Sequence, residues 1–130
     1  MEIEQLEASL LGISDLDGDC DAISDLISIK LDSMGITHER YCGYVEAKST
    51  AEWVLPHCWI ECKINNNDYI IDFRLTKWLS SDKYIHLHGV FHKKSHINVV
   101  NYIGNEDLRV KTDTLSTLNL SPNDKDLLLE

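Results

Sequence analysis

The segment from Cys20 to Met34 constrains the fold of this chain more than any other, because its apolar residues repeat at helical intervals. Residues spaced three and four positions apart share one side of an α-helix, so the pattern predicts a helix with a single buried stripe. Gly35 follows directly, and glycine is the usual residue just past a helix end. The stripe consists of Ile23, Leu26, Ile27, Leu31 and Met34.

The rest of the chain combines a second helical pattern with several strand patterns. Residues 3–11 predict a short amphipathic helix. Three asparagines at 65–67 separate two strand patterns and predict a hairpin, since asparagine tolerates positive φ. The segment 112–130 is polar and predicts a short docking helix followed by a frayed tail. Strands are expected at residues 36–45, 57–64, 68–75, 84–91 and 97–102, with a connection at 46–56 that holds a helical turn.

This order of elements predicts an α+β fold, in which N-terminal helices pack on an antiparallel β-sheet. Residues 1–130 form one domain by length, and they are numerous enough to bury a core without disulfides or a metal. No apolar run is long enough to span a membrane, and the first residues lack the basic and apolar regions of a signal peptide. We therefore expect a cytoplasmic protein with no membrane partner.

Charge and cysteine content narrow the expected partners. Twelve Lys and Arg residues stand against twenty-two Asp and Glu residues, which gives a net charge of -10 and argues against nucleic-acid binding. A basic protein or peptide would be the favoured partner, although acidity most often serves solubility alone. The four cysteines, at 20, 42, 58 and 62, are expected to be reduced in the cytosol, with Cys58 and Cys62 as small core residues.

Three residues have the chemical types of a cysteine nucleophile, its base and the group that orients the base. Cys20 begins the predicted helix, His57 begins a predicted strand, and Asp72 follows the predicted hairpin. Cysteine attacks as the thiolate, and the free N–H groups and dipole of a helix start favour that form. Aspartates at 17, 19 and 21 act against it, so a nearby imidazolium would have to offset them.

The register of the hairpin decides whether His57 and Asp72 can meet. Side chains alternate along a strand, so His57 and Glu61 share a face. A hairpin closed around residues 66–67 places Asp72 opposite Glu61, on the face of His57 but about 13 Å away along the strand. A longer loop spanning residues 62–67 would place Asp72 directly opposite His57. Both registers stay open, and Glu61 is the rival carboxylate.

Each member of the trio also has an ordinary structural explanation. A single cysteine on an apolar helix stripe is usually a small buried hydrophobe. A histidine at a strand start is more often a polar group with satisfied hydrogen bonds than a base, and an aspartate at a strand end is more often a cap. The combination of the three, and not any one of them, suggests chemistry.

Together these residues resemble the transglutaminase-like branch of the papain-like cysteine enzymes. In that superfamily a glycine precedes the nucleophile at a helix start, a glycine ends the helix, and a strand precedes a His-x-Trp-hydrophobic-Glu sequence, a hairpin and an aspartate. Two departures are Ala22, which lies closer to the cysteine than in the family pattern, and Phe73-Arg74, where many relatives carry Pro-Thr. The resemblance covers about residues 18–75, through Gly18-Asp19-Cys20-Asp21-Ala22, Met34-Gly35-Ile36, Gly43-Tyr44-Val45, His57-Cys58-Trp59-Ile60-Glu61 and Ile70-Ile71-Asp72.

The resemblance implies a papain-like core with Cys20 as nucleophile, His57 as general base and acid, and Asp72 as the group that orients His57. It implies a protease, deamidase or transglutaminase-like reaction on a peptide or protein carboxamide, through a thioester and without a cofactor or metal. The backbone N–H of Cys20 is the expected first oxyanion donor, and Trp59 is expected to wall the substrate site. The alternative is a catalytically inactive binding or inhibitory module on the same scaffold.

A second constellation consists of four histidines within eleven residues. Imidazoles at such spacings can bind zinc or another transition metal. No carboxylate completes a recognised metal-binding motif, and the competing explanation is a partly basic surface loop that includes Lys93 and Lys94. The four are His86, His88, His92 and His96.

Overall fold

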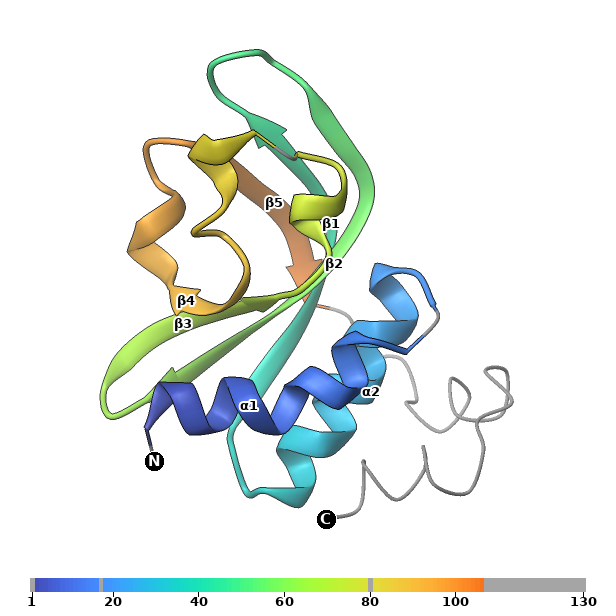
Figure 1. Ribbon diagram of the computed structural model, residues 1–130, viewed down its shortest axis with the longest axis vertical. Coiled ribbons are helices and arrows are strands. Elements are labelled where there is room, and N and C mark those ends of the chain that lie inside the picture. The colour runs from blue at the N-terminus through green and yellow to red at the C-terminus, as the bar shows by residue number, and fades with distance from the viewer. Residues whose placement is uncertain (1, 17, 80, 107–130) are drawn as a thin grey trace.

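The computed structural model describes residues 2–16, 18–79 and 81–106, and it confirms the α+β class. Two helices precede an antiparallel five-stranded sheet whose strand order is β4-β3-β2-β1-β5 (Figure 1). No helix in the described ranges combines the length and apolar character needed to cross a membrane. The elements are α1 (Ile3–Ser14), α2 (Cys20–Ser33), β1 (His38–Ala47), β2 (Trp53–Ile64), β3 (Asn67–Asp72), β4 (Gly89–His92) and β5 (Val100–Glu106), with 3-10 turns η1 (Leu75–Lys77), η2 (Asp82–Tyr84) and η3 (Lys93–His96).

Helix α2 forms where the apolar spacing predicts it, and both of its ends are satisfied locally. The Asp19 carboxylate accepts the Ala22 N–H at 2.9 Å, which is the usual role of an aspartate at a helix N-cap. At the other end, Gly35 adopts a positive φ of 72°, a conformation that glycine reaches without steric cost. Four residues of the apolar stripe, Ile23, Leu26, Ile27 and Leu31, are buried, and Met34 is partly buried.

The sheet is buried on both faces, by different layers. On one face, α2 packs on β1 and β2 while α1 packs on α2 and β4, and Leu26 and Leu31 pack in one cluster with Ile60 and Ile71. The segment between β3 and β5, yellow to orange in Figure 1, lies against the other side of the sheet. That segment and the sheet form a second cluster, which contains Trp59, Leu75, Leu79, Tyr84 and Leu87.

A buried ion pair holds α2 against β1. The Arg40 guanidinium lies 2.6 Å from the Asp25 carboxylate and 3.0 Å from that of Asp21, and Arg40 also donates to the backbone carbonyl of Asp21. Arg40 and Asp25 are both almost fully buried. Because an ion pair at such depth is weakly screened by solvent, it constrains where α2 can sit on the sheet.

Several predicted boundaries were wrong. Strand β2 begins at Trp53, so His57 lies within the strand and not at its start. The predicted connection at 46–56 therefore contains strand, and Trp53 and Val54 pair with β1. The strand predicted at 84–91 is strand only from Gly89, where β4 (Gly89–His92) begins. Residues 84–88 are not strand because Tyr84 and Leu87 pack into the core from a 3-10 turn and the turn that follows it. Strand β5 covers 100–106, and the helix expected at 112–130 lies outside the described residues.

We predict that Arg40→Met destabilises the fold strongly. Removing the guanidinium leaves the buried Asp25 carboxylate without its closest cation, which typically costs about 3–5 kcal/mol. Urea denaturation followed by circular dichroism measures this loss in the free energy of unfolding. The exposed Lys63→Met is the matched control on β2 and should change stability by less than about 0.5 kcal/mol. Equal losses in the two variants would contradict a structural role for the ion pair.

Candidate active site

Cys20 reaches the sheet at an edge of β2. Its sulfur accepts the backbone N–H of Cys58 at 3.2 Å and lies 3.8 Å from the carbonyl oxygen of Pro56. The β2–β3 pairing ends at Ile60 opposite Ile71, so β2 continues past the end of its neighbour. The sulfur thus occupies the place where a neighbouring strand would supply a carbonyl acceptor. Helix α2, whose first residue is Cys20, docks its N-terminus at this edge.

The register of the hairpin differs from both predicted registers. Asn65 and Asn66 adopt positive φ values of 52° and 67°, and the strands close with Ile64 opposite Asn67. Extending the register from Ile60–Ile71 brings Asp72 opposite Trp59, so the predicted alignments with Glu61 or His57 were wrong. Asp72 is instead the diagonal neighbour of His57 on the same face, which is within reach of long side chains.

His57 and Asp72 form a buried hydrogen-bonded pair. Nε2 of His57 lies 2.6 Å from Oδ2 of Asp72, and His57 is 0% exposed. The other oxygen of Asp72, Oδ1, accepts the backbone N–H groups of Arg74 and Leu75 at 2.9 and 3.0 Å. The Tyr102 hydroxyl donates to Oδ2 at 2.8 Å. The carboxylate is therefore held from three segments of the chain and cannot rotate without breaking several bonds.

This environment favours the protonated imidazolium of His57. Burial lowers the pKa of His57, but the charge of Asp72 and its hydrogen bond to the ring outweigh that effect. The neighbouring Cys20 raises the pKa of His57 further, to about 10. Tyr102 responds in the same direction, because burial and the adjacent Asp72 carboxylate raise its pKa well above the ordinary value.

The two ring nitrogens of His57 have different surroundings. Nε2 is committed to Asp72, whereas Nδ1 is buried and meets no partner of conventional hydrogen-bond geometry among residues 2–16, 18–79 and 81–106. Cys20 is among the groups that raise the pKa of His57. In a histidine that serves as a catalytic base, one nitrogen is oriented by a carboxylate and the other exchanges protons with a nucleophile.

Asp19 and Asp21, two of the three aspartates near Cys20, have other partners, and Asp17 lies outside the described residues. Asp19 caps the helix through Ala22, and Asp21 pairs with Arg40. The sulfur of Cys20 itself accepts the backbone N–H of Cys58.

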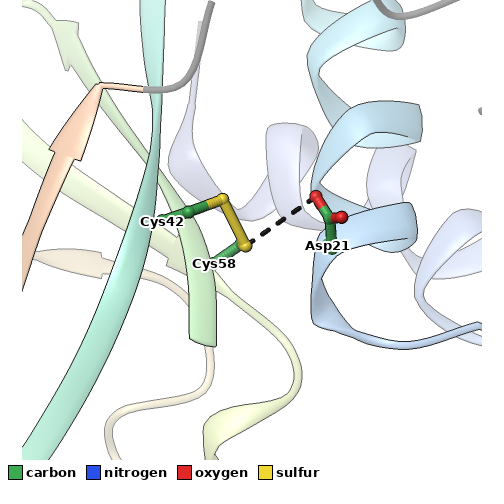
Figure 2. A group of neighbouring side chains, drawn as sticks. All are labelled: Asp21, Cys42 and Cys58. Atoms are coloured by element: carbon green, nitrogen blue, oxygen red, sulfur yellow. Dashed lines mark hydrogen bonds between the residues drawn. A yellow bond between two sulfur atoms is a disulfide. The ribbon is translucent and has the colours of Figure 1, made fainter. Parts of the chain in front are cut away.

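Cys42 and Cys58 form a disulfide between β1 and β2, which corrects the prediction that Cys58 is a reduced core residue (Figure 2). They lie directly opposite each other in the register, with Cα atoms 4.1 Å apart. The sulfur of Cys58 lies 3.8 Å from Oδ1 of Asp21 on α2. These three side chains group metal-ligand atoms within 4.8 Å, but the disulfide leaves neither cysteine as the thiolate that a metal would bind.

Trp59 and Glu61 lie beside the pair and take other roles. Trp59 is 1% exposed and lies in the second core cluster, where its ring meets Tyr102 edge-on at 4.9 Å. Its indole N–H donates to Glu61 at 3.1 Å, and Glu61 also binds the Lys93 ammonium at 2.6 Å. Glu61 is therefore not the carboxylate that orients His57. Trp59 stacks beside His57 within the core and does not line the cavity that borders Cys20.

A cavity of about 950 Å³ opens beside Cys20. Its lining includes Cys20, Pro56 and three large apolar side chains that are exposed to solvent, Trp53, Leu55 and Trp78. Cys20 lines this cavity, whereas His57 is not part of the lining and is fully buried. Nothing in the local sequence marks Tyr102, Trp53 or Trp78 as site residues, because their positions depend on the register of β5 and β2 and on the turn after β3.

The four histidines considered for metal binding point to separate partners. His86 contacts the carbonyl of Ser95, His88 contacts the hydroxyl of Thr76, and His96 contacts the carbonyl of Val100, while the His92 ring packs on Tyr69. Within the described ranges these imidazoles form no group with metal-binding geometry. This arrangement agrees with the alternative of a surface loop.

Comparisons with known proteins leave the family open. No protein-family model, no curated protein and no solved structure matches this chain.

We predict that His57 stays protonated well above neutral pH and that stability depends on this proton. The ordinary pKa of 6.5 is raised to about 10 in the folded state, so the folded protein binds the proton more tightly than the unfolded chain. The resulting stabilisation is complete below pH 6.5 and is lost as the pH rises through about 10. Nitrogen-detected NMR of the imidazole and urea denaturation from pH 6 to pH 10 measure the two effects.

Asp72→Asn is the matched variant for this experiment. It keeps the shape of the side chain but removes the charge that raises the pKa of His57, so the imidazole should titrate at lower pH and the stability slope should flatten. A wild-type His57 that titrates near its ordinary value would contradict the geometry of the pair.

We also predict that the protein purified without reductant carries two free thiols. Cys42 and Cys58 are paired, which leaves Cys20 and Cys62. Burial, assisted by the charge of Asp68, raises the pKa of the Cys62 thiol to about 11, so it should react only after unfolding. A colorimetric thiol count before and after denaturation should give one accessible thiol and then two. Four thiols after denaturation would show that the disulfide does not form.

Proposed function

We propose that this protein is a cysteine-dependent amide hydrolase or acyltransferase that acts on a peptide or protein carboxamide through a thioester. The observation that supports it most is the buried His57–Asp72 pair, in which Nε2 of His57 binds Asp72 and Nδ1 has no hydrogen-bond partner among the described residues, while Cys20 is near enough to raise the pKa of His57. The nucleophile begins a helix and borders an open cavity, as acyl-transfer chemistry requires. The proposal agrees with the transglutaminase-like resemblance.

In the first half of the proposed reaction, a substrate carboxamide enters the cavity beside Cys20. The Cys20 sulfur attacks the carbonyl carbon as the thiolate, and the negative charge moves to the carbonyl oxygen. The backbone N–H of Cys20 is the proposed first donor to that oxygen, since the first N–H groups of a helix have no partner within the helix. The His57 imidazolium then gives its proton to the departing nitrogen, and the C–N bond breaks to leave a thioester and ammonia or an amine.

In the second half, neutral His57 accepts a proton from water or from an acceptor amine as it attacks the thioester. The C–S bond breaks, the acid or the new amide leaves, and the proton held by His57 restores the ion pair with Cys20. Asp72 keeps the same ring orientation through both halves, and Tyr102 and two backbone N–H groups hold Asp72 in place.

The proposed partners are peptides or proteins, and the net charge of -10 favours basic ones over nucleic acid. The cytoplasm is the compartment expected from the sequence. The Cys42–Cys58 disulfide argues against it, because cytosolic thiols are kept reduced.

We predict that iodoacetamide labels Cys20 selectively at mildly acidic pH. A thiolate paired with an imidazolium persists where an ordinary thiol is protonated, so Cys20 should react at least about tenfold faster than a free cysteine at pH 6.5. Mass spectrometry of peptides from the native protein identifies the labelled residue and its rate. His57→Gln should remove the enhancement, and Asp72→Asn should reduce it.

Cys62→Ala is the matched control, because it removes the other free thiol and should leave the labelling rate of Cys20 unchanged. Circular dichroism of each variant separates loss of the ion pair from loss of the fold. If Cys20 in the folded protein is labelled only at the rate of a free thiol, the result contradicts the enzyme hypothesis and favours the inactive binding module.

A further inference from the structure

The cavity beside Cys20 is walled by aromatic side chains that the reaction itself does not use. Trp53 is 56% exposed and Trp78 is 68% exposed, although burying an indole is strongly favourable. The third tryptophan of the chain, Trp59, is buried elsewhere, so both exposed tryptophans border one cavity. Exposed apolar side chains that gather in a hollow next to a nucleophile are typical of ligand sites.

Each of these two tryptophans lies on an element that also carries or contacts a member of the His57–Asp72 pair. Trp53 lies four residues before His57 on β2, and its ring stacks on that of Tyr44 with centroids 4.9 Å apart. Trp78 follows the η1 turn, whose first residue, Leu75, donates its N–H to Asp72. The Asp72 carboxylate that orients His57 thus also holds the turn that carries Trp78.

The lining of the cavity contains both apolar and charged side chains. Leu55 adds a third exposed apolar side chain, and Val54 and Leu79 lie in the lining from the core. Charged groups of both signs border it, including Glu52 and Lys77, so the rim has no single sign that would select a charged ligand. Apolar contact is therefore the main source of binding energy available there.

We propose that this cavity, bordered by Trp53 and Trp78, selects substrates in which an aromatic or large aliphatic side chain neighbours the reacting carboxamide in an extended peptide. That side chain lies between the two indoles while the carboxamide reaches the Cys20 sulfur. The inference rests on the function proposed for Cys20. It adds a substrate class, namely peptides with a bulky apolar side chain next to the reacting amide.

Binding to a variant that cannot react tests the substrate class separately from turnover. The Cys20→Ala protein is titrated with the peptides Ac-Phe-Gln-Gly-NH2, Ac-Gly-Gln-Phe-NH2, Ac-Ala-Gln-Gly-NH2 and Ac-Lys-Gln-Gly-NH2, and dissociation constants are measured by calorimetry. At least one phenylalanine peptide should bind about tenfold or more tightly than the alanine peptide. Trp53→Ala and Trp78→Ala, each added to Cys20→Ala, should remove this preference, and Trp78→Phe should retain most of it.

Ile85→Ala, added to the same background, is the matched control, since Ile85 is 71% exposed and lies outside the cavity lining. It should leave the preference intact. Equal binding of the phenylalanine and alanine peptides, tightest binding of the lysine peptide, or a preference that survives both tryptophan substitutions would overturn the inference. A wild-type protein that releases ammonia equally from all four peptides would overturn it while supporting the proposed function. Selective binding of phenylalanine peptides without turnover would support the binding site and contradict the enzyme.

Discussion

The carboxylate of Asp72 is the interaction on which the rest of the site depends. It receives hydrogen bonds from the backbone just after β3, from Tyr102 on β5 and from His57 on β2. These elements are separated along the chain, and a buried carboxylate is stable only when such donors surround it. The same carboxylate therefore links β2, β5 and the segment after β3, binds the imidazole of His57 and raises its pKa. Fold stability and the proposed chemistry share one set of contacts.

Cys20 depends on a second constraint, the docking of α2 at the exposed edge of β2. Arg40 fixes the helix against β1 through Asp25, and the end of β3 leaves the Cys58 N–H to the Cys20 sulfur. Cys20 therefore faces the cavity, while His57 remains within the core. In the proposed reaction, this separation would exclude water from the imidazole and admit substrate to the sulfur.

The trio illustrates how far sequence reasoning reached and where it stopped. The helix that begins at Cys20 was predictable because its stripe and caps are local features. His57 and Asp72 were correctly assigned to one strand face, since alternation needs no knowledge of the fold. The predicted distance between them along the strand was wrong. The turn uses Asn65 and Asn66, so Asp72 lies opposite Trp59 and not opposite Glu61 or His57. The hydrogen bond from Tyr102 to Asp72 could not be predicted from the sequence, because the position of Tyr102 depends on the pairing of β5 with β1.

By itself, the sequence determined the α+β class, the helix starting at Cys20, the hairpin and the three residue types of the site. Each follows from interactions between residues close in the chain: apolar periodicity, caps, turn propensities and strand alternation. The tertiary structure alone decided the diagonal meeting of His57 with Asp72, the Cys42–Cys58 disulfide and the indole walls of the cavity. These contacts join residues from different strands and turns. Their distances depend on strand register and sheet twist, which the packing of the whole domain determines.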